Sequence, residues 1–321
     1  MTINNKVWIL DDQGLTHDAE IKMYEDNQIE WKWTETKDYQ ADLINFGQYA
    51  DVVVIQVGYP CDEALIKQLH HCKAILAFGM GFNNVDLDVA REYKIDVSHV
   101  PEYCLDEVAD HTLALLLSSA RQINYYDRTV KQGNWNSIAP TSIHRMNHLT
   151  VGLYGFGRIA RKVAERLNAF GVNIIASDAY VPASVFDEYG VKQVSFETLL
   201  DTSHILSLHV PLNDETRNSL NYTQLKKLPK HARIINTCRG GIINEKDLLF
   251  LLQEDHLAGA ALDVLEEEPP TNASELVKHE RTIISPHAAY FSLEAEVELQ
   301  TQTAENVLRV MKQETLKNIV N

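Results

Sequence analysis

The chain has 321 residues, of which 45% are hydrophobic, and this is enough for two domains with substantial cores. A formal net charge of -16 argues against nucleic acid or an anionic membrane as a partner. The four cysteines lack CxxC spacing, which indicates reduced thiols in a cytoplasm and neither a disulfide framework nor a zinc site. The longest strongly apolar stretch, residues 113–117, is too short to span a bilayer.

The first part of the chain alternates strands and helices. Residues 6–10 and 50–57 predict strands, the second nearly continuous in β-branched side chains. A short strand is expected near residues 29–34, and a helix over 61–71 leads into a strand over 74–78. This pattern predicts a small parallel-sheet domain.

Gly79-Met80-Gly81 follows the strand over 74–78 directly. A loop with two glycines at the carboxyl end of a strand exposes backbone N–H groups, and an anion could bind there. The plainer alternative is a turn before a helix that Asp86 caps. Residues 95–100 predict another strand, and residues 105–124 a long helix that packs between domains or across a subunit interface.

A nucleotide fingerprint occupies the middle of the chain. An apolar strand enters Gly155 and Gly157, a helical run follows, and a second apolar strand ends at Asp178. The first glycine permits the tight turn, the second lets a pyrophosphate approach the backbone, and the small Ala160 lets the helix pack on the strand. An acid about 20 residues further on can accept hydrogen bonds from the ribose hydroxyls and would repel a 2′-phosphate. The pattern therefore predicts NAD rather than NADP.

The βα alternation continues after Asp178. The sequence predicts helices over 195–201, 221–226, 245–253 and 292–312, and strands over 205–210, 233–237, 259–264 and 282–285. The histidines of the loop at 144–148 lack the spacing of metal ligands, so no metal is expected.

Three of the later strands are followed by a charged or titratable residue: Arg239, Glu268 and His287. In a doubly wound sheet these ends face the crevice that holds the cofactor. Hydride transfer to a keto group needs a proton donor, and histidine paired with a carboxylate serves near neutral pH. Arginine binds a carboxylate through two hydrogen bonds. Taken singly, each residue has an ordinary alternative role: Arg239 in a surface ion pair, Glu268 as a solvated acid and His287 in a capping turn.

Together these features resemble the D-isomer-specific 2-hydroxyacid dehydrogenase family over nearly the whole chain. The motifs that support the resemblance are residues 151–178, 236–241, 261–269 and 285–289. The resemblance implies that Arg239 binds substrate, that Glu268 pairs with the histidine and that His287 donates the proton. It also implies a set of residues at the NAD site: Gly155, Gly157, Arg158, Ile159, Asp178, His209, Val210, Pro211, Thr237, Cys238 and Asp263.

The family likeness also implies the layout of the chain. It predicts an α/β fold with two Rossmann-like parallel-sheet domains: a smaller, discontinuous substrate domain at residues 1–100 and 290–321, and an inserted NAD-binding domain at 101–289. Members usually dimerise through the NAD-binding domain. The loop Gly79-Met80-Gly81 matches the segment whose N–H groups hold the substrate carboxylate.

Departures from the family pattern narrow the substrate. Residues near Gln56 and Ala77 are uncharged where phosphoglycerate dehydrogenases place basic groups, and formate dehydrogenases have glutamine in place of Glu268. The segments at 103–111 and 286–292 are similar to the subgroup related to C-terminal-binding proteins, in which an aromatic residue matching Tyr290 lies near the substrate. The sequence therefore predicts an NAD-dependent enzyme that interconverts small 2-keto acids and D-2-hydroxy acids. The alternative is an NAD(H)-sensing protein of the corepressor type.

Overall fold

The computed structural model describes residues 4–12, 16–271 and 273–321. It divides into two compact units, one made of residues 1–104 with 291–321 and the other of residues 105–290. Both units are built on sheets in which all paired strands are parallel. The predicted α/β class with two Rossmann-like sheets is therefore confirmed.

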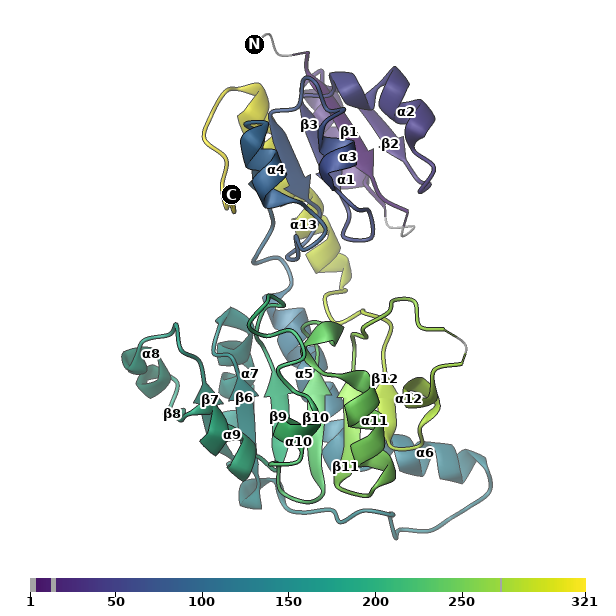
Figure 1. Ribbon diagram of the computed structural model, residues 1–321, viewed down its shortest axis with the longest axis vertical. Helices are drawn as coiled ribbons and strands as arrows, with labels where there is room; N and C mark the ends of the chain where they lie inside the picture. The colour runs from purple at the N-terminus through teal and green to yellow at the C-terminus, as the bar shows by residue number, and fades with distance from the viewer. Residues whose placement is uncertain (1–3, 13–15, 272) are drawn as a thin grey trace. The chain divides into compact units, whose positions relative to one another are not determined.

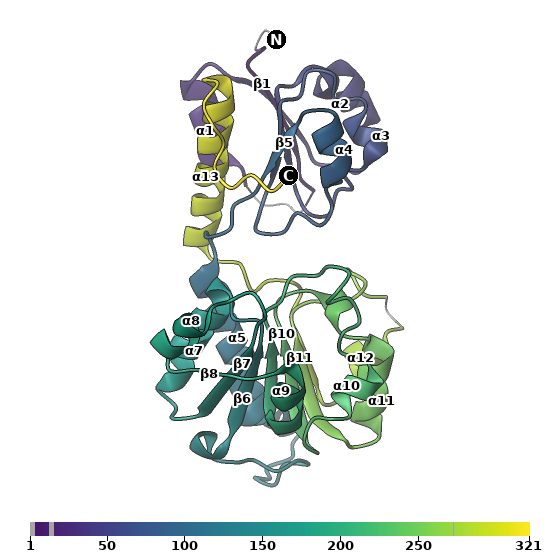
Figure 2. The same cartoon turned by 60° about the vertical axis from the view of Figure 1, so that its left-hand side comes forward.

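The first unit has a five-stranded sheet in the order β2-β1-β3-β4-β5. Its strands are β1 (Lys6–Leu10), β2 (Glu30–Thr34), β3 (Val52–Ile55), β4 (Ala74–Ala77) and β5 (Asp96–Ser98). The central strands are apolar on both faces because helices cover both. One face carries α1 (Asp18–Asp26) and α13 (Leu293–Met311), and the other carries α2 (Gln40–Asn45), α3 (Glu63–Ile66) and α4 (Leu87–Glu92) (Figures 1 and 2).

The helix predicted over residues 61–71 is shorter in the structure. The side chain of Asp62 caps α3 by accepting a hydrogen bond from the Leu65 N–H at 3.1 Å. After Ile66 the backbone bonds change to the i to i+3 spacing, from Gln68 N–H to Leu65 O and from Leu69 N–H to Ile66 O. The helix ends there because these tighter turns bury Leu69 and bring the chain to β4.

The second unit has a seven-stranded sheet in the order β12-β11-β10-β9-β6-β7-β8. Its strands are β6 (Thr150–Tyr154), β7 (Asn173–Ser177), β8 (Lys192–Gln193), β9 (Ile205–Leu208), β10 (Ala232–Asn236), β11 (Leu257–Leu262) and β12 (Thr282–Ile284). The strand order reverses on either side of β6. A crevice outside the carboxyl ends at such a reversal is where open α/β sheets bind ligands.

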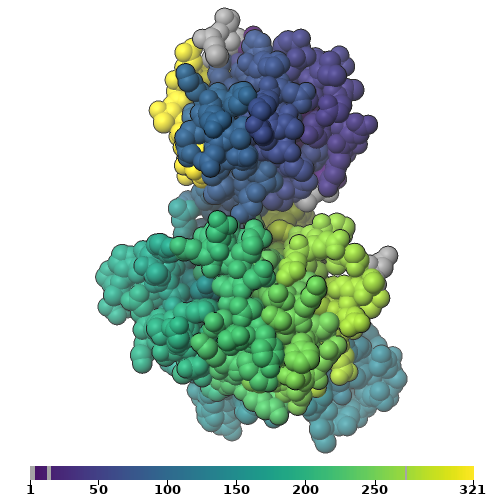
Figure 3. Space-filling view, viewed as in Figure 1, coloured from purple at the N-terminus to yellow at the C-terminus, as the bar shows by residue number. Residues whose placement is uncertain are grey.

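Helices cover both faces of this second sheet as well. α5 (Leu105–Ala120), α7 (Arg158–Asn168) and α8 (Ala183–Glu188) lie toward one side, and α9 (Phe196–Thr202), α10 (Tyr222–Leu225), α11 (Glu245–Gln253) and α12 (Glu275–Lys278) toward the other (Figure 2). α6 (Ile123–Lys131) follows α5 along the chain. In the space-filling view, atoms fill the space in front of both sheets (Figure 3). None of the helices in the described part of the chain is long and apolar enough to cross a membrane.

The long helix predicted over residues 105–124 is interrupted. α5 ends at Ala120, and α6 starts at Ile123 after Gln122, which has a left-handed backbone with φ of 58°. Glutamine gives no sequence signal for this conformation, which favours glycine or asparagine. The short elements α2, α8, β8 and α12 were not predicted either.

A buried group of polar side chains lies beneath the carboxyl end of β1 in the first unit. His17 lies between Asp11 and Glu20, and all three are almost completely buried. The Tyr24 hydroxyl donates to the second oxygen of Glu20 at 3.0 Å. Burial alone would lower the pKa of His17, but its hydrogen bonds to Asp11 and Glu20 and their charges outweigh this and raise the pKa to about 9.

This arrangement predicts that the first unit loses stability in alkaline solution. A histidine with a raised pKa stabilises the folded state fully below its unfolded value, near 6.5, and that contribution is lost as pH rises through the folded value, about 9. The loss is roughly 3 kcal/mol in the free energy of unfolding. Urea unfolding followed by tryptophan fluorescence measures it, because three of the four tryptophans belong to this unit.

His17→Gln is expected to unfold more easily at pH 7 and to lose this pH dependence. The exposed His70 provides the matched control, and His70→Gln is expected to behave as the natural protein. An unchanged pH profile in His17→Gln would contradict the assignment.

Candidate active site and cofactor site

The glycine fingerprint forms a turn between β6 and α7. Gly155 has φ of +93°, and a Cβ there would lie 2.6 Å from the backbone oxygen of His209. Only glycine fits both constraints. Gly157, in contrast, faces open space, with no atom within 4 Å of where its Cβ would be. The first turn of α7 follows at once, and the N–H groups of a first helical turn favour an anion.

Asp178 lies beside this turn, after the end of β7. One carboxylate oxygen accepts the Phe156 N–H at 2.8 Å and the other accepts the Tyr180 N–H at 2.8 Å. An ionised carboxylate has about four acceptor positions, so two hydrogen bonds leave capacity for the hydroxyls of a ligand. Asp178 therefore both orders the glycine turn and presents a negative charge next to it.

The ends of β9 and β10 supply the next residues of the predicted cofactor site. His209 follows β9, and its backbone N–H donates to Tyr154 O of β6 at 2.7 Å, while Val210 and Pro211 come next. Burial lowers the pKa of His209 to about 3, so its ring is neutral. The ring lies 2.9 Å from the Ser207 hydroxyl.

Thr237 and Cys238 follow β10. The Thr237 hydroxyl is 2.7 Å from the hydroxyl of Thr112 on α5. Burial raises the pKa of Cys238 to about 11. Cys238 is therefore a thiol at neutral pH and not a nucleophile, because nucleophilic attack needs the thiolate.

Glu268 and His287 form a hydrogen-bonded pair. His287 Nδ1 lies 2.6 Å from one oxygen of Glu268, and the other oxygen accepts the Leu265 N–H at 2.9 Å. Burial would raise the pKa of Glu268, but the hydrogen bond and charge of His287, the Leu265 N–H and the charge of Arg239 together hold this pKa below its usual range. Glu268 is therefore an anion at neutral pH, and it orients the imidazole ring through Nδ1.

The turn that holds His287 is fixed by Asp263, which follows β11 and is 2% exposed. One oxygen of Asp263 accepts from the Ser285 hydroxyl at 2.5 Å and from the Ala288 N–H at 3.0 Å. The other accepts from the Ala289 N–H at 2.9 Å, and the backbone oxygen of Asp263 accepts from the His287 N–H at 2.7 Å. These bonds hold His287 at φ of 53°, a strained value for a residue with a side chain.

Arg239 lies on a loop packed tightly against the Glu268 loop. Its guanidinium donates to the backbone oxygen of Cys238 at 2.6 Å. The buried Asn236 side chain holds both sides of this loop, accepting the Cys238 N–H at 3.0 Å and donating to Arg239 O at 2.9 Å. Gly240 follows, and a Cβ there would come 1.9 Å from the backbone carbon of Leu265. Arg239 and Glu268 are thus held on adjoining loops.

Tyr290 and the Gly79-Met80-Gly81 loop complete the predicted set. The Tyr290 ring meets the ring of His287 edge-on, with 6.5 Å between the centroids. The glycine loop belongs to the first unit, at the carboxyl end of β4, where Gly79 has φ of +144° and Met80 O is 2.8 Å from His99 Nδ1. The loop therefore turns the chain at Gly79, in a backbone conformation that favours glycine.

The sequence did not point to three side chains that organise the site: His111, Asn236 and Ser285. The Ser285 hydroxyl connects Asp263 to His111 Nε2, which lies 2.9 Å from it. A polar residue at the end of an otherwise apolar strand was the signal for Asn236, which is 1% exposed. Within the part of the chain that the structure describes, no three histidine, cysteine or acidic side chains gather in a position to hold a metal ion.

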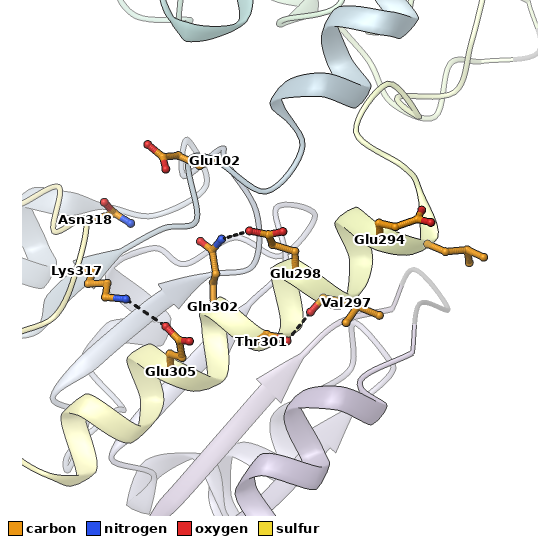
Figure 4. Close-up of a pocket in the computed structure, with 10 residues that line it drawn as sticks. Glu102, Glu294, Val297, Glu298, Thr301, Gln302, Glu305, Lys317 and Asn318 are labelled. Carbon is orange, nitrogen blue, oxygen red and sulfur yellow. Dashed lines mark hydrogen bonds and ion pairs between the residues drawn. The ribbon is translucent and has the colours of Figure 1, made fainter.

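A groove of about 920 Å³ runs along α13 in the first unit (Figure 4). Four glutamates line it: Glu102, Glu294, Glu298 and Glu305. Lys317 also lines the groove, but its Nζ lies 3.1 Å from the Glu305 carboxylate. A groove with this excess of negative charge does not suit a carboxylate or pyrophosphate ligand.

Known proteins share this sequence pattern. The family model described as "D-isomer specific 2-hydroxyacid dehydrogenase, NAD binding domain" matches residues 113–289. D-3-phosphoglycerate dehydrogenase of Methanocaldococcus jannaschii is 34% identical over 307 residues, which are 95% of this chain and 58% of that protein. Glyoxylate reductase of Thermococcus litoralis is 34% identical over 278 residues, 84% of this chain and 83% of that protein. The chain thus spans about half the length of the phosphoglycerate dehydrogenases that it matches.

Solved structures agree with this assignment. A glyoxylate reductase from Paecilomyes thermophila superposes with a TM-score of 0.88 at 28% identity and covers 99% of both chains. D-lactate dehydrogenase from Aquifex aeolicus, complexed with NAD and lactic acid, gives a TM-score of 0.88 at 25% identity over 96% of each chain. These relatives are named as dehydrogenases and reductases, and the corepressor alternative is not favoured.

The resemblance seen in the sequence is therefore confirmed by matches of three independent kinds. The family model alone covers more than half of the chain, and the glyoxylate reductase extends the likeness over both units. The chain belongs to the D-isomer specific 2-hydroxyacid dehydrogenase family.

Proposed function

We propose that the chain is an NAD-dependent enzyme that interconverts a small 2-keto acid and the corresponding D-2-hydroxy acid. The observation that supports this most directly is the 2.6 Å contact of His287 with Glu268, next to Arg239. These side chains follow β10, β11 and β12 at the carboxyl edge of the sheet that also carries the glycine turn after β6. An acid–base pair and a carboxylate-binding arginine at that edge match the needs of keto-acid reduction.

The glycine turn fits a dinucleotide. The open space over Gly157 leaves room for a pyrophosphate, and the adjoining start of α7 favours its charge. The charge of Asp178 favours a ribose with free hydroxyls over a 2′-phosphate, so the cofactor is NAD. We assign the remaining contacts to Arg158, Ile159, His209, Val210, Pro211, Thr237, Cys238 and Asp263. NAD supplies the hydride when it is bound.

The protein's own contribution is to move one proton and to hold the substrate. His287 donates through Nε2 to the substrate oxygen, because Nδ1 is engaged by Glu268. The anionic Glu268 stabilises the protonated ring before transfer and sets its orientation. Arg239 orients the substrate carboxylate and polarises the carbonyl. In the oxidative direction His287 accepts the proton.

The two units have different roles in this proposal. We assign the expected NAD-binding domain, residues 101–289, to the second unit, and the expected substrate domain, residues 1–100 with 290–321, to the first; the bounds of the units themselves are residues 105–290 and residues 1–104 with 291–321. The N–H groups of Gly79, Met80 and Gly81 hold the substrate carboxylate, and Tyr290 limits the size of its side chain. Gln56 and Ala77, at the ends of β3 and β4, bring no charge to bind a phosphate, so the substrate is not phosphorylated. The location proposed for the protein is the cytoplasm.

Keto-acid reduction by the full chain tests the reaction. NADH oxidation is expected with at least one of pyruvate, glyoxylate, hydroxypyruvate and a branched-chain 2-keto acid, at about 1 per second or faster. His287→Ala is expected to lower kcat by about 100-fold or more while the Kd for NADH stays within about twofold. Glu268→Gln keeps the shape but not the charge, and an intermediate loss is expected.

The exposed His148, in the same unit, is the matched control, and His148→Ala is expected to keep full activity. Tight NADH binding without turnover on any of these acids would favour a sensing protein instead. A loss of NADH affinity in His287→Ala would contradict the role given to this histidine.

A second substitution tests the cofactor turn separately. In Gly157→Ala the new methyl group enters open space in the protein, so the melting temperature is expected to change by less than about 2 °C. The same methyl group would clash with the pyrophosphate where it approaches the backbone, so the affinity for NADH is expected to fall about tenfold or more. Calorimetric titration with NADH measures this.

Gly241→Ala is the control, since its Cβ would make only ordinary contacts, 3.4 Å from Leu212 Cδ2. It is expected to keep both stability and NADH affinity. If Gly157→Ala bound NADH as tightly as the natural protein, the dinucleotide would have to lie elsewhere.

We further propose that the chain forms a homodimer through α6 and the segment that follows it. Large apolar side chains are exposed there: Ile123, Val130, Trp135 at 91% and Ile138 at 75%. This segment runs along the surface of the second unit (Figure 1). A monomer rarely exposes so many large apolar groups together, whereas an interface buries them.

Light scattering is expected to give twice the chain mass of 36.4 kDa. The double variant Trp135→Ser, Ile138→Ser is expected to shift the mass toward that of one chain, because it removes the largest apolar groups of the surface. Ile44→Ser, at an exposed position on α2, is the control and is expected to leave the mass unchanged. A dimer that survives the double substitution would place the interface elsewhere.

A further inference from the structure

A cavity in the second unit lies away from the site described above. It is lined by Arg233, Ala258 and Ile283, each the second residue of its strand, so it lies at the amino-terminal edge of β10, β11 and β12. His287 follows the opposite, carboxyl end of β12. The cavity has a volume of about 30 Å³, which is more than one water molecule needs. It is a small, partly open space at the end of the sheet that the proposed reaction does not use, and α6 contributes Asn124, Tyr125 and Arg128 to its lining.

Arg233 is a buried charge without an acidic partner. It is 6% exposed, and its guanidinium donates to two hydroxyls, those of Ser119 at 3.4 Å and Thr141 at 3.0 Å. Among the residues that the structure describes, no carboxylate lies within ion-pairing distance of it. Buried arginines are almost always paired, because an uncompensated charge in the interior is costly. Arg233 therefore lacks the counter-charge that its position requires.

Two further arginines, Arg281 and Arg128, line the same cavity. Arg281 contributes to the lining while its Nη1 is bound to Asp255 at 2.6 Å, and Arg128 donates to the backbone oxygen of Glu280 at 3.2 Å. Glu280 is the one acidic residue of the lining, and its side chain is exposed and makes no ion pair with a described residue. Burial, with the charge of Arg281, lowers the pKa of Arg233 to about 10, which still leaves it charged at neutral pH.

Part of the remaining lining consists of side chains that can donate hydrogen bonds to oxygen atoms. Ser118, Ser119 and Gln122 provide hydroxyl and amide donors. The Ser119 oxygen accepts from Arg233, so its own proton remains available to a ligand. At Gly259 a Cβ would lie 3.4 Å from Arg233 Nη1 and 2.9 Å from Arg281 O, so glycine leaves the space that the guanidinium occupies. The planar guanidinium suits two-point recognition of a carboxylate or phosphate.

We propose that Arg233, with Arg281, Arg128 and the hydroxyls of Ser118 and Ser119, forms a binding site for one small oxyanion, a free phosphate or carboxylate. The anion supplies the counter-charge that Arg233 lacks within the chain. The site lies at the opposite edge of the sheet from the proposed catalytic residues, so it does not depend on the proposed reaction.

Inorganic phosphate is the probe. Equilibrium dialysis of the full chain with radiolabelled phosphate is expected to show one bound phosphate per chain, with binding at least about tenfold weaker in Arg233→Met. At ten times its Kd, phosphate is expected to raise the melting temperature by about 3 °C relative to chloride of the same ionic strength, and this shift is absent in Arg233→Met. Without phosphate, Arg233→Met is expected to melt at the same or a higher temperature than the natural protein, because it replaces an uncompensated buried charge with an apolar side chain.

Arg121 provides the matched control, since it is exposed and lies outside the lining, and Arg121→Gln is expected to bind phosphate normally. If Arg233→Met does not fold, the half-buried Arg128→Gln replaces it, with severalfold weaker binding expected. Equal binding by the natural protein and the variants, or no binding by either, would overturn the proposal. One pair of results would overturn it as well: the natural protein binds no phosphate, and the Arg233→Met variant no longer dimerises. In that case a carboxylate of the second copy would be the partner of Arg233.

Discussion

The buried carboxylate of Asp263 holds the segment on which the proposed chemistry depends. It gathers the Ser285 hydroxyl and the N–H groups of Ala288 and Ala289 around two oxygen atoms. This fixes the backbone of His287 in a left-handed conformation, which is uncommon for residues other than glycine. Because the turn is fixed, the ring meets Glu268 at Nδ1 and leaves Nε2 for a substrate. An acid–base pair of this kind needs orientation before it needs a tuned pKa, and Asp263 supplies the orientation.

His17 in the first unit and His287 in the second have acidic partners, whereas the buried Arg233 has none among the residues that the structure describes. In the first unit the buried His17 lies between the acidic side chains of Asp11 and Glu20, and the Tyr24 hydroxyl donates to a further oxygen of Glu20. In the second unit the Glu268 carboxylate is hydrogen-bonded to His287, and the positive charge of Arg239 also acts on it. Arg233 departs from this pattern, with two hydroxyls in place of an acid. The contrast within one chain is the reason to look for a ligand there.

Much of the fold and of the candidate site could be predicted from the sequence because both follow local rules. The glycines and Asp178 mark a strand-turn-helix-strand unit, and parallel strands bring the residues that follow them to one edge, which is why Arg239, Glu268 and His287 could be grouped. The role of Asp263 as the anchor of a turn could not be predicted, because its partners Ser285 and Ala289 lie more than twenty residues further along the chain. The break at Gln122 was missed for a different reason, since only tertiary packing selects a left-handed conformation for glutamine.

A crystal structure of the full chain with NADH and a 2-keto acid analogue that cannot be reduced is the sharpest test of the role proposed for His287. We expect His287 Nε2 to lie within hydrogen-bonding distance of the oxygen that replaces the keto group, Glu268 to remain hydrogen-bonded to Nδ1, and the Arg239 guanidinium to contact the same molecule. A complex in which the analogue binds away from His287, or in which Glu268 has left the ring, would contradict it.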